Sequence, residues 1–227
     1  MNRGIYRCGA AMMTELRRQD IHTNNLANVS TNGFKRSLGK IINGGDPQEA
    51  GWVSASTDLS NGPIESTNSP LDLALESSGF FVVQGVNGPE YTRNGHFTRD
   101  ASGFMCTTDG RRVLGAQGPI NLGQGDVAIS TDGWVQSNGK RLDRLQVVDY
   151  NPGDILAHEQ NASLTATRAP QAVETYTVQQ GAIEHSNVSA MVELGAIRSG
   201  FRVYEANARI IEQTDRSLQK LIEAAGS

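Results

Sequence analysis

The sequence has few of the residues that would indicate a disulfide framework or a membrane segment. It contains two cysteines, Cys8 and Cys106, with no CxxC spacing, and 6% aromatic residues. Two free thiols are therefore favoured over a disulfide. No apolar run reaches the roughly 20 residues that span a bilayer, and the apolar stretch at 10–13 is shorter than the 7 to about 15 residues of a signal-peptide core. Membrane insertion and conventional secretion are not predicted.

A strong excess of either charge is also missing. Twenty Lys and Arg residues are set against 24 Asp and Glu residues, which gives a net charge of -4. The basic pairs are scattered along the chain, at 17–18, 35–36, 111–112 and 140–141. A protein without a concentrated basic patch has no general attraction to a phosphate backbone. Nucleic acid is therefore not an expected partner.

Catalytic and metal-binding patterns are absent as well. The four histidines lie far apart, and no GxSxG, Walker, GxGxxG or HExxH pattern occurs. Several aspartates lie next to turns, where the side chain commonly bonds its own backbone. The residues thus predict no enzyme, no cofactor and no metal site. A secreted β-domain glycan-binding module or enzyme is the alternative from a different class of protein.

What the sequence does contain is helical periodicity at both ends. Near the C-terminus apolar residues recur at steps of three and four, interrupted at Asp215: Leu194, Ile197, Phe201, Tyr204, Ala208, Ile211, Leu218 and Ile222. The N-terminal 3–28 stretch shows a weaker version: Ile5, Gly9, Met12, Leu16 and Leu26. This spacing predicts helices that each pack along one narrow stripe. Periodicity alone leaves open whether they pack on a central body or on each other.

Between these ends the period changes to two. Turn dipeptides such as Asp109-Gly110 and Asn138-Gly139 separate short strand candidates. The candidates lie at 77–85, 90–92, 96–98, 104–107, 111–114, 127–129, 134–136, 145–148, 163–166 and 174–178. An α+β chain with a central antiparallel β domain is predicted. The expected divisions are 1–36, 37–62 (a linker), 63–182 (the β domain) and 183–227.

A polar segment follows the first predicted helix. The sequence "NNLANVSTNGFKR", from Asn24 to Arg36, alternates asparagines with Leu26, Val29 and Phe34. Asparagine donates and accepts hydrogen bonds at once, so it can satisfy irregular backbone where a helix ends. Burial of the three apolar side chains would then hold a bend. We predict that residues 24–36 form an elbow, where the first helix stops and the chain turns outward.

Four stretches together resemble the bacterial flagellar basal-body rod and hook family. They are "DIHTNNLANVSTNGFKR", "LSNGPIESTNSPLDLALESSGFFVVQG", "YTRNGHFTRDASGFMCTTDGRRVLG" and "QQGAIEHSNVSAMVELGAIRSGFRVYEANARIIEQTDRSLQKLI". The resemblance implies a structural axial subunit. It implies that both ends form helices that pair into a coiled-coil domain, which lines a hollow helical drive shaft. It also implies export through the flagellar type III apparatus and a place in the periplasmic part of the basal body.

The resemblance also implies which residues mediate assembly and with what partners. The partners would be copies of the chain itself, other rod proteins and the type III export apparatus. The short polar stretch at 37–57 and the compact β domain favour a proximal-rod-like member, with a distal-rod or hook-type subunit as the alternative. The implied assembly residues are Asn24, Asn25, Leu26, Asn28, Val29, Gly33, Phe34, Asn187, Val188, Leu194, Ile197, Phe201, Tyr204, Asn207, Ile211 and Leu218.

Overall fold

A computed structural model describes residues 3–42, 52–86, 88–150, 155–158, 163–166 and 170–225. The fold is α+β, with one helix near each end and antiparallel strands between them. The chain divides into two compact units. The helical unit comprises 1–27, 37–56 and 189–227, and the β unit comprises 28–36 and 57–188. The predicted elbow is divided between the units: 24–27 end α1, and 28–36, which we call the elbow segment, are part of the β unit.

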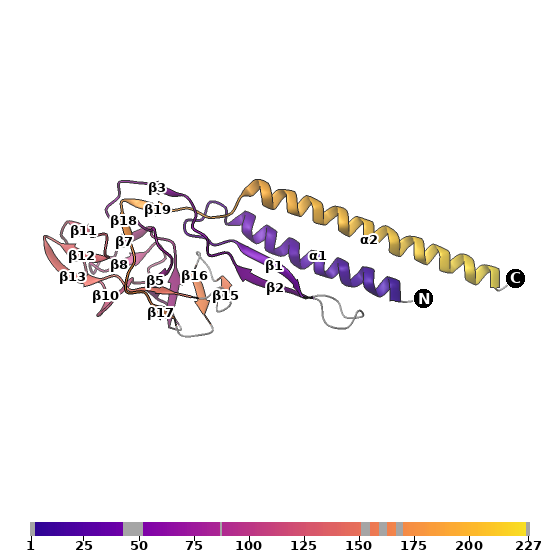
Figure 1. The fold of residues 1–227 in the computed structure, drawn as a ribbon, viewed down its shortest axis with the longest axis horizontal. Coiled ribbons are helices and arrows are strands. Elements are labelled where there is room, and N and C mark those ends of the chain that lie inside the picture. The colour runs from indigo at the N-terminus through magenta and orange to yellow at the C-terminus, as the bar shows by residue number, and fades with distance from the viewer. Residues whose placement is uncertain are drawn as a thin grey trace. The chain divides into compact units, whose positions relative to one another are not determined.

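The helical unit is built from two helices of unequal length. Helix α1 (Arg3–Ala27) has 25 residues and α2 (Ala190–Ala225) has 36, which correspond to about 38 and 54 Å. They pack side by side and antiparallel, and α2 continues past the N-terminal end of α1 (Figure 1). Neither described helix has the length and apolarity needed to cross a membrane.

Two strands complete the helical unit. β1 (Ser37–Ile42) and β2 (Trp52–Thr57) form a two-stranded sheet, and β1 contacts α1. The sequence predicts a linker here because the stretch is polar and lacks alternation. Gly39 makes the contact close, since a Cβ at this position would lie 3.0 Å from Cδ1 of Ile21. The close packing of β1 on α1 thus depends on the small size of Gly39, which hydrophobic periodicity does not reveal.

Local chemistry accounts for the start of α2. The carbonyl of Ser189 accepts a hydrogen bond from the Glu193 amide at 3.1 Å, so Ser189 occupies the cap position that serine favours. Glu193 lies in the first turn, where the helix dipole favours a negative charge.

The β unit consists of one large sheet and several small ones. The six-stranded sheet has the order β15-β16-β6-β5-β14-β17, and the three-stranded sheet has the order β11-β12-β13. Four two-stranded sheets, β10-β9, β18-β4, β19-β3 and β7-β8, complete it. All the pairings given for this unit are antiparallel.

The bounds of the β-unit strands are as follows. The first nine are β3 (Ile64–Ser66), β4 (Leu73–Leu75), β5 (Phe80–Gln84), β6 (Pro89–Thr92), β7 (Phe97–Arg99), β8 (Met105–Thr107), β9 (Leu114–Gly115), β10 (Gly118–Pro119) and β11 (Val127–Ile129). The others are β12 (Trp134–Ser137), β13 (Lys140–Arg144), β14 (Val147–Asp149), β15 (Ile155–His158), β16 (Ser163–Ala166), β17 (Gln171–Ala172), β18 (Val178–Gln180) and β19 (Ala182–Glu184).

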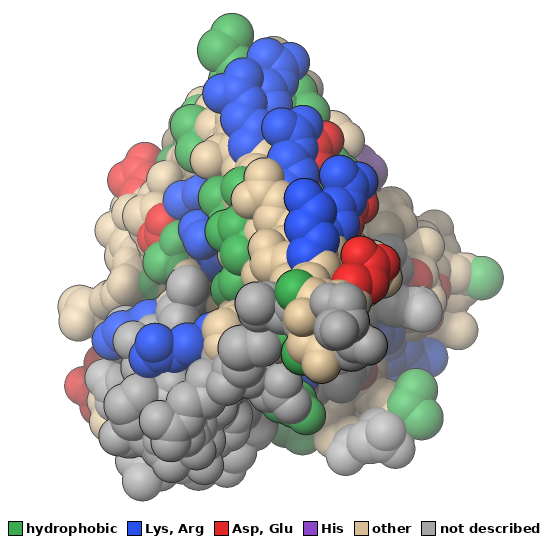
Figure 2. All heavy atoms as spheres, turned by 90° about the vertical axis from the view of Figure 1, so that its right-hand side faces the viewer, with side chains coloured by type: hydrophobic (Ala, Val, Ile, Leu, Met, Phe, Trp, Pro, Cys, Tyr) green, Lys and Arg blue, Asp and Glu red, His purple; other side chains and the backbone are tan. Residues whose placement is uncertain are grey.

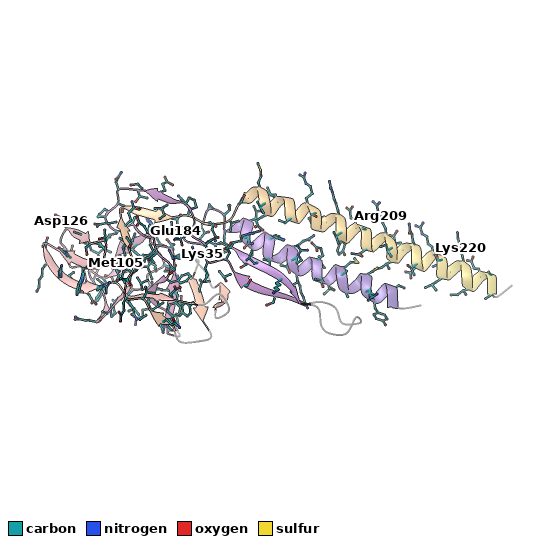
Figure 3. The ribbon with its side chains drawn as sticks, viewed as in Figure 1. Lys35, Met105, Asp126, Glu184, Arg209 and Lys220 are labelled. Carbon is teal, nitrogen blue, oxygen red and sulfur yellow. The ribbon has the colours of Figure 1, made fainter. Side chains whose placement is uncertain are left out.

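Strand β5 shows how the core is divided. Phe81 and Val83 belong to the larger apolar cluster, whereas Phe80 and Val82 belong to a second one. Because successive side chains point to opposite faces of a strand, the large sheet is covered on both faces. Met105, labelled in Figure 3, is fully buried in the larger cluster.

Most of the predicted strands are present, but of the strand predicted at 174–178 only Val178 lies in a strand, β18. Of the strand predicted at 111–114, only Leu114 belongs to a strand, β9. Strand β13 is not predicted from the sequence, because the pair Lys140 and Arg141 is typical of a solvated surface. The turn before β13 was recognised correctly. Asn138 and Gly139 both have positive φ, 50° and 74°, as a two-residue hairpin turn requires. The Asn87-Gly88 turn dipeptide includes Asn87, which lies outside the described residues.

Candidate functional site

The elbow segment leaves helical geometry through consecutive turns. The Thr31 amide donates to the carbonyl of Asn28 at 3.1 Å, and the Phe34 amide donates to the carbonyl of Thr31 at 3.2 Å. The Thr31 hydroxyl also donates to the side-chain oxygen of Asn28, at 3.3 Å. Short local bonds therefore replace the helical ladder immediately after α1.

Gly33 brings the elbow segment into direct contact with the rest of the β unit. Its φ is +68°, and its amide donates to the carbonyl of Glu184 at 2.7 Å. A Cβ at this position would lie 2.2 Å from the backbone nitrogen of Asn94. Only glycine combines this backbone conformation with such a close approach.

A small apolar cluster holds the end of the segment. Phe34 is 2% exposed and packs with Val188, and Val29 packs against both. Burial of a side chain of this size stabilises the folded state by roughly 1.5–3 kcal/mol. Three of the predicted assembly residues, Val29, Phe34 and Val188, thus meet inside the β unit.

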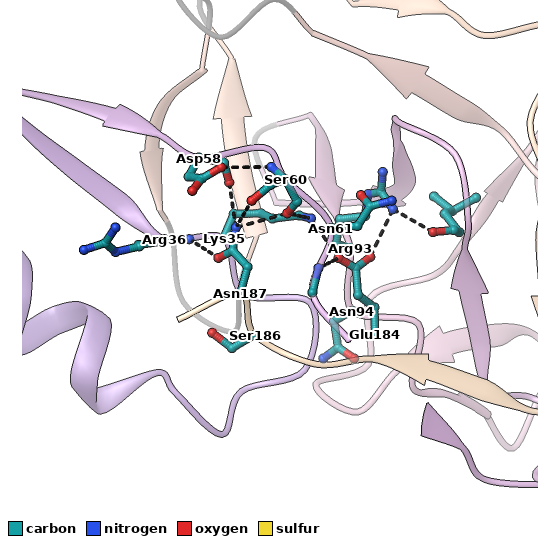
Figure 4. Close-up of polar contacts among 12 residues, drawn as sticks. Lys35, Arg36, Asp58, Ser60, Asn61, Arg93, Asn94, Glu184, Ser186 and Asn187 are labelled. Atoms are coloured by element: carbon teal, nitrogen blue, oxygen red, sulfur yellow. Dashed lines mark hydrogen bonds and ion pairs between the residues drawn. The ribbon is translucent and has the colours of Figure 1, made fainter. Parts of the chain in front are cut away.

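Next to this cluster lies a buried group of charges, which we call the Glu184 cluster: Lys35, Arg93 and Glu184. Lys35 Nζ lies 2.8 Å from Glu184 Oε1, and Arg93 Nη1 lies 3.0 Å from Glu184 Oε2 (Figure 4). The exposed fractions of the three side chains are 1%, 2% and 1% for Lys35, Arg93 and Glu184. A further bond comes from the Gly62 amide, which donates to Glu184 Oε1 at 2.8 Å.

Backbone carbonyls accept further hydrogen bonds from both cations, while Arg93 Nε is buried without a hydrogen-bond partner among the described residues. Lys35 Nζ donates to the carbonyl of Ser60 at 2.7 Å, and Arg93 donates to the carbonyls of Leu75 and Ser77 at 3.0 and 2.6 Å. Burial lowers the pKa of Lys35 and of Arg93, and the carboxylate of Glu184 opposes that shift. The cluster therefore depends on Glu184 to compensate two desolvated cations.

Asn187 ties the elbow segment to two other stretches of chain. Its Oδ1 accepts from the Arg36 amide at 2.7 Å, and its Nδ2 donates to the carbonyls of Asp58 and Ser60 at 3.1 and 3.0 Å (Figure 4). Its own amide donates to the carbonyl of Phe34 at 3.3 Å. One side chain thereby joins the stretches at 34–36 and 58–60 to 187.

In the helical unit, Asn25 is the buried member of the asparagine-rich stretch. Its Nδ2 donates to the carbonyl of Ser37, and its Oδ1 accepts from the Ser37 amide, both at 2.8 Å. Asn25 is fully buried, whereas Leu26 is half-buried and Asn24 is exposed. Asn25 therefore bonds the backbone of the first residue of β1, 12 positions further along the chain.

The predicted apolar stripe of α2 is only partly turned inward. Leu194 and Phe201 are 53% and 54% exposed, while the neighbouring Glu193 and Gly200 are buried. The other predicted residues, Ile197, Tyr204, Asn207, Ile211 and Leu218, are half-buried. Near the start of α2 the buried positions are thus Glu193 and Gly200, each one residue before Leu194 and Phe201. Further along, Ile197, Tyr204, Ile211 and Leu218 lie on the predicted stripe and are half-buried.

The outer surface of α2 carries basic side chains. Arg209 and Lys220 extend from the face of the helix that lies away from α1 (Figure 3). Figure 2 shows Lys and Arg side chains in a row along the helix, and Arg198, Arg202, Arg209, Arg216 and Lys220 are all exposed. Within the described residues, no group of three or more potential metal ligands occurs.

Three family models match successive parts of the chain. Residues 6–35 match "Flagella basal body rod protein", residues 74–137 match "Flagellar hook protein FlgE/F/G D1 domain", and residues 179–224 match "Flagellar basal body rod FlgEFG protein C-terminal". These matches cover α1 with most of the elbow segment, part of the β unit, and α2. They define the class as a flagellar axial protein.

Relatives extend the similarity over the whole chain. A flagellar basal-body rod protein FlgF of Caulobacter vibrioides is 30% identical, with 100% of this chain and 99% of that protein covered. FlgF of Escherichia coli is 31% identical with 95% of each covered, and FlgG of Bacillus subtilis is 29% identical with 98% of each covered. The chain belongs to the flagellar basal-body rod protein family. It is a structural rod subunit of the basal body, in a family without enzymatic activity.

Proposed function

We propose that this subunit assembles through its terminal helices, paired as a coiled coil, into the hollow helical shaft of the rod. Exposed apolar side chains on these helices carry the proposal. Leu194, Phe201, Val203 and Ile210 on α2 and Met13 on α1 are each at least 45% exposed. Apolar side chains at regular helical spacing are stabilised when a neighbouring helix covers them.

The length of α2 supports the same proposal. Its last turns continue past α1, so they have no partner helix among the described residues of the unit (Figure 1). Ile222, in this extension, is 71% exposed. Copies of this chain and other rod proteins are the proposed neighbours, and the flagellar type III export apparatus is the proposed route to them.

We propose that the elbow segment serves assembly because it is firmly attached to the rest of the β unit. Phe34, Lys35 and Asn187 bind it to the β unit, and Asn25 fixes the end of α1 on β1. We propose that Phe34, Lys35 and Asn187 serve assembly by holding the elbow segment within the β unit, and that Asn25 serves it by holding α1 on β1 within the helical unit. The boundaries 1–36, 37–62, 63–182 and 183–227 remain our proposed functional division of the chain.

A proximal position in the rod is proposed on the stretch at 37–57. Its described residues, 37–42 and 52–57, form the short strands β1 and β2, and a stretch of this length is too short for a long insertion. Electron microscopy of basal bodies from a strain with this gene deleted tests both proposals. A missing rod or a short stub is expected. An intact rod would refute the structural role, and a long rod ending before the hook would refute only the proximal position.

A further inference from the structure

The contact between α1 and α2 is polar at its most buried points. Among the described residues of the two helices, those classed as buried are Thr14, Glu15, Asn25, Glu193 and Gly200. Four carry a polar or charged side chain and the fifth is glycine. An interface that only needed stability would place apolar side chains at these positions.

Two contacts define how the helices are aligned. His22 Nδ1 lies 2.6 Å from Glu193 Oε2, and the side chain of Glu193 is 0% exposed. Glu15 lies over Gly200, since a Cβ there would be 2.3 Å from Glu15 Oε1. Glu15 and His22 are seven residues apart on α1, and Glu193 and Gly200 are seven apart on α2. The two contacts therefore match one antiparallel alignment.

Apolar packing alone does not specify this alignment. Ile197, Tyr204, Ile211 and Leu218 are half-buried and follow one another at intervals of seven residues. Sliding α2 by seven residues, about 10 Å, would replace each of them by the next. Such a displaced alignment would retain much of the apolar contact.

The polar contacts distinguish the alternatives. A slip of seven residues in one direction would place Glu193 opposite Glu15, which brings two buried carboxylates together. A slip in the other direction would move Glu193 beyond the end of α1 and away from His22. A buried carboxylate without a partner is strongly unfavourable. Both displaced alignments are therefore destabilised.

We infer that the His22–Glu193 pair and the Glu15–Gly200 contact form a register lock, which selects one alignment of the two helices. Asn25 extends the lock to β1, because its Nδ2 lies 3.4 Å from Glu193 Oε2 and it bonds both backbone groups of Ser37. Buried polar groups that fix register at the expense of stability are known from coiled coils. The lock gives every subunit the same helix offset.

Distance measurements between two spin labels test this inference. The full chain with Cys8→Ala and Cys106→Ala would carry labels at the exposed positions Arg17→Cys and Arg209→Cys. Double electron–electron resonance should give one narrow distance maximum. His22→Leu combined with Glu193→Leu should add a second maximum, from an axial displacement of about 10 Å. The matched control is Glu65→Leu with His185→Leu, which alters an ion pair of the β unit and should leave one maximum.

Gly200→Ala provides a second variant that does not weaken the helix, because alanine favours helix more than glycine. Its Cβ should displace Glu15 and produce a second or broadened maximum, and Glu15→Ala in the same chain should restore one maximum. If the double leucine variant loses its helical circular dichroism signal, the Gly200→Ala chains with and without Glu15→Ala still test the register lock. A broad distribution of the label-to-label distance in the chain with His22, Glu193, Glu15 and Gly200 unchanged would overturn the inference of a register lock. An unchanged single maximum in the Gly200→Ala chain, or in a helical double leucine variant, also overturns it.

Discussion

Lys35 and Glu184 lie 149 positions apart in the sequence and form an ion pair of 2.8 Å, with both side chains 1% exposed. The pair fastens the segment after α1 to the strand that precedes α2. Because Arg93 shares the same carboxylate, one acidic side chain compensates two buried cations. The attachment of the elbow segment thus depends on Glu184, a single residue that no helix or strand pattern in the sequence singles out.

Glu184→Ala should lower the free energy of unfolding of the β unit by about 3–5 kcal/mol, since it leaves two buried cations uncompensated. Urea denaturation followed by tryptophan fluorescence measures the change. Glu65→Ala is the matched control, because Glu65 pairs with His185 at the surface and should change the free energy by about 1 kcal/mol or less. Equal effects of the two substitutions would contradict the role assigned to Glu184.

Gly33→Ala should destabilise the β unit by about 2 kcal/mol or more, because alanine must adopt positive φ and its Cβ would meet the backbone at Asn94. Gly110→Ala is the comparison. Gly110 also has positive φ, +87°, but open space surrounds its Cβ direction. Its substitution should cost only about 1 kcal/mol. The difference between the two midpoints in urea isolates the steric contact, and identical midpoints would exclude it.

Leu194→Ser with Phe201→Ser should abolish rod assembly while the monomer stays folded, since both side chains are exposed on α2. Val86→Ser is the control, because Val86 is 96% exposed on the β unit. Swimming assays and electron microscopy of basal bodies report assembly, and circular dichroism reports folding. Normal rods in the serine double variant would show that this face of α2 does not mediate assembly.

Limited proteolysis of the dilute monomer should cleave the ends of α1 and α2 well before the β unit. The β unit has two apolar clusters, whereas the buried positions of the helix pair are polar. Mass spectrometry of the fragments locates the cuts, and a resistant core near residues 60–180 is expected. Cleavage that begins within that core would contradict the proposed order of stability.

Raising the pH above about 10 should weaken the β unit through Tyr176. Its hydroxyl donates to the carbonyl of Leu145, and burial raises the pKa of Tyr176 while the nearby Arg144 opposes the shift. The unfolded chain therefore loses this proton first, at a pH of about 10, so the stabilisation is complete below that pH and declines above it. Urea midpoints at pH 8 and 10.5 should differ less in Tyr176→Phe than in the unsubstituted chain. An equal difference in both chains would exclude Tyr176 as the source.

Local signals in the sequence were sufficient for much of this structure. The Asn138-Gly139 turn, strand β5 and both helices follow from residue preference and period, which act over a few positions. The local bonds of the elbow segment, from Thr31 to Asn28 and from Phe34 to Thr31, also join residues three positions apart. Each of these features depends on neighbours in the chain.

The Glu184 cluster could not be predicted in this way. Arg93 and Glu184 are 91 positions apart, and nothing in their spacing connects them. The burial of Glu193 and Gly200 in place of Leu194 and Phe201 has a related cause. Leu194 and Phe201 fit an apolar seam better than Glu193 and Gly200 do, and only the side chains of α1, His22 and Glu15, reverse that preference.

The long sequence separation between Lys35 and Glu184 has a kinetic consequence. A chain that emerges N-terminus first presents Lys35 early, and its carboxylate partner follows only after nearly 150 further residues. Closing so long a loop is entropically costly and slows folding. The Glu184 cluster therefore forms only after residue 184 has been made, late in the synthesis of the chain.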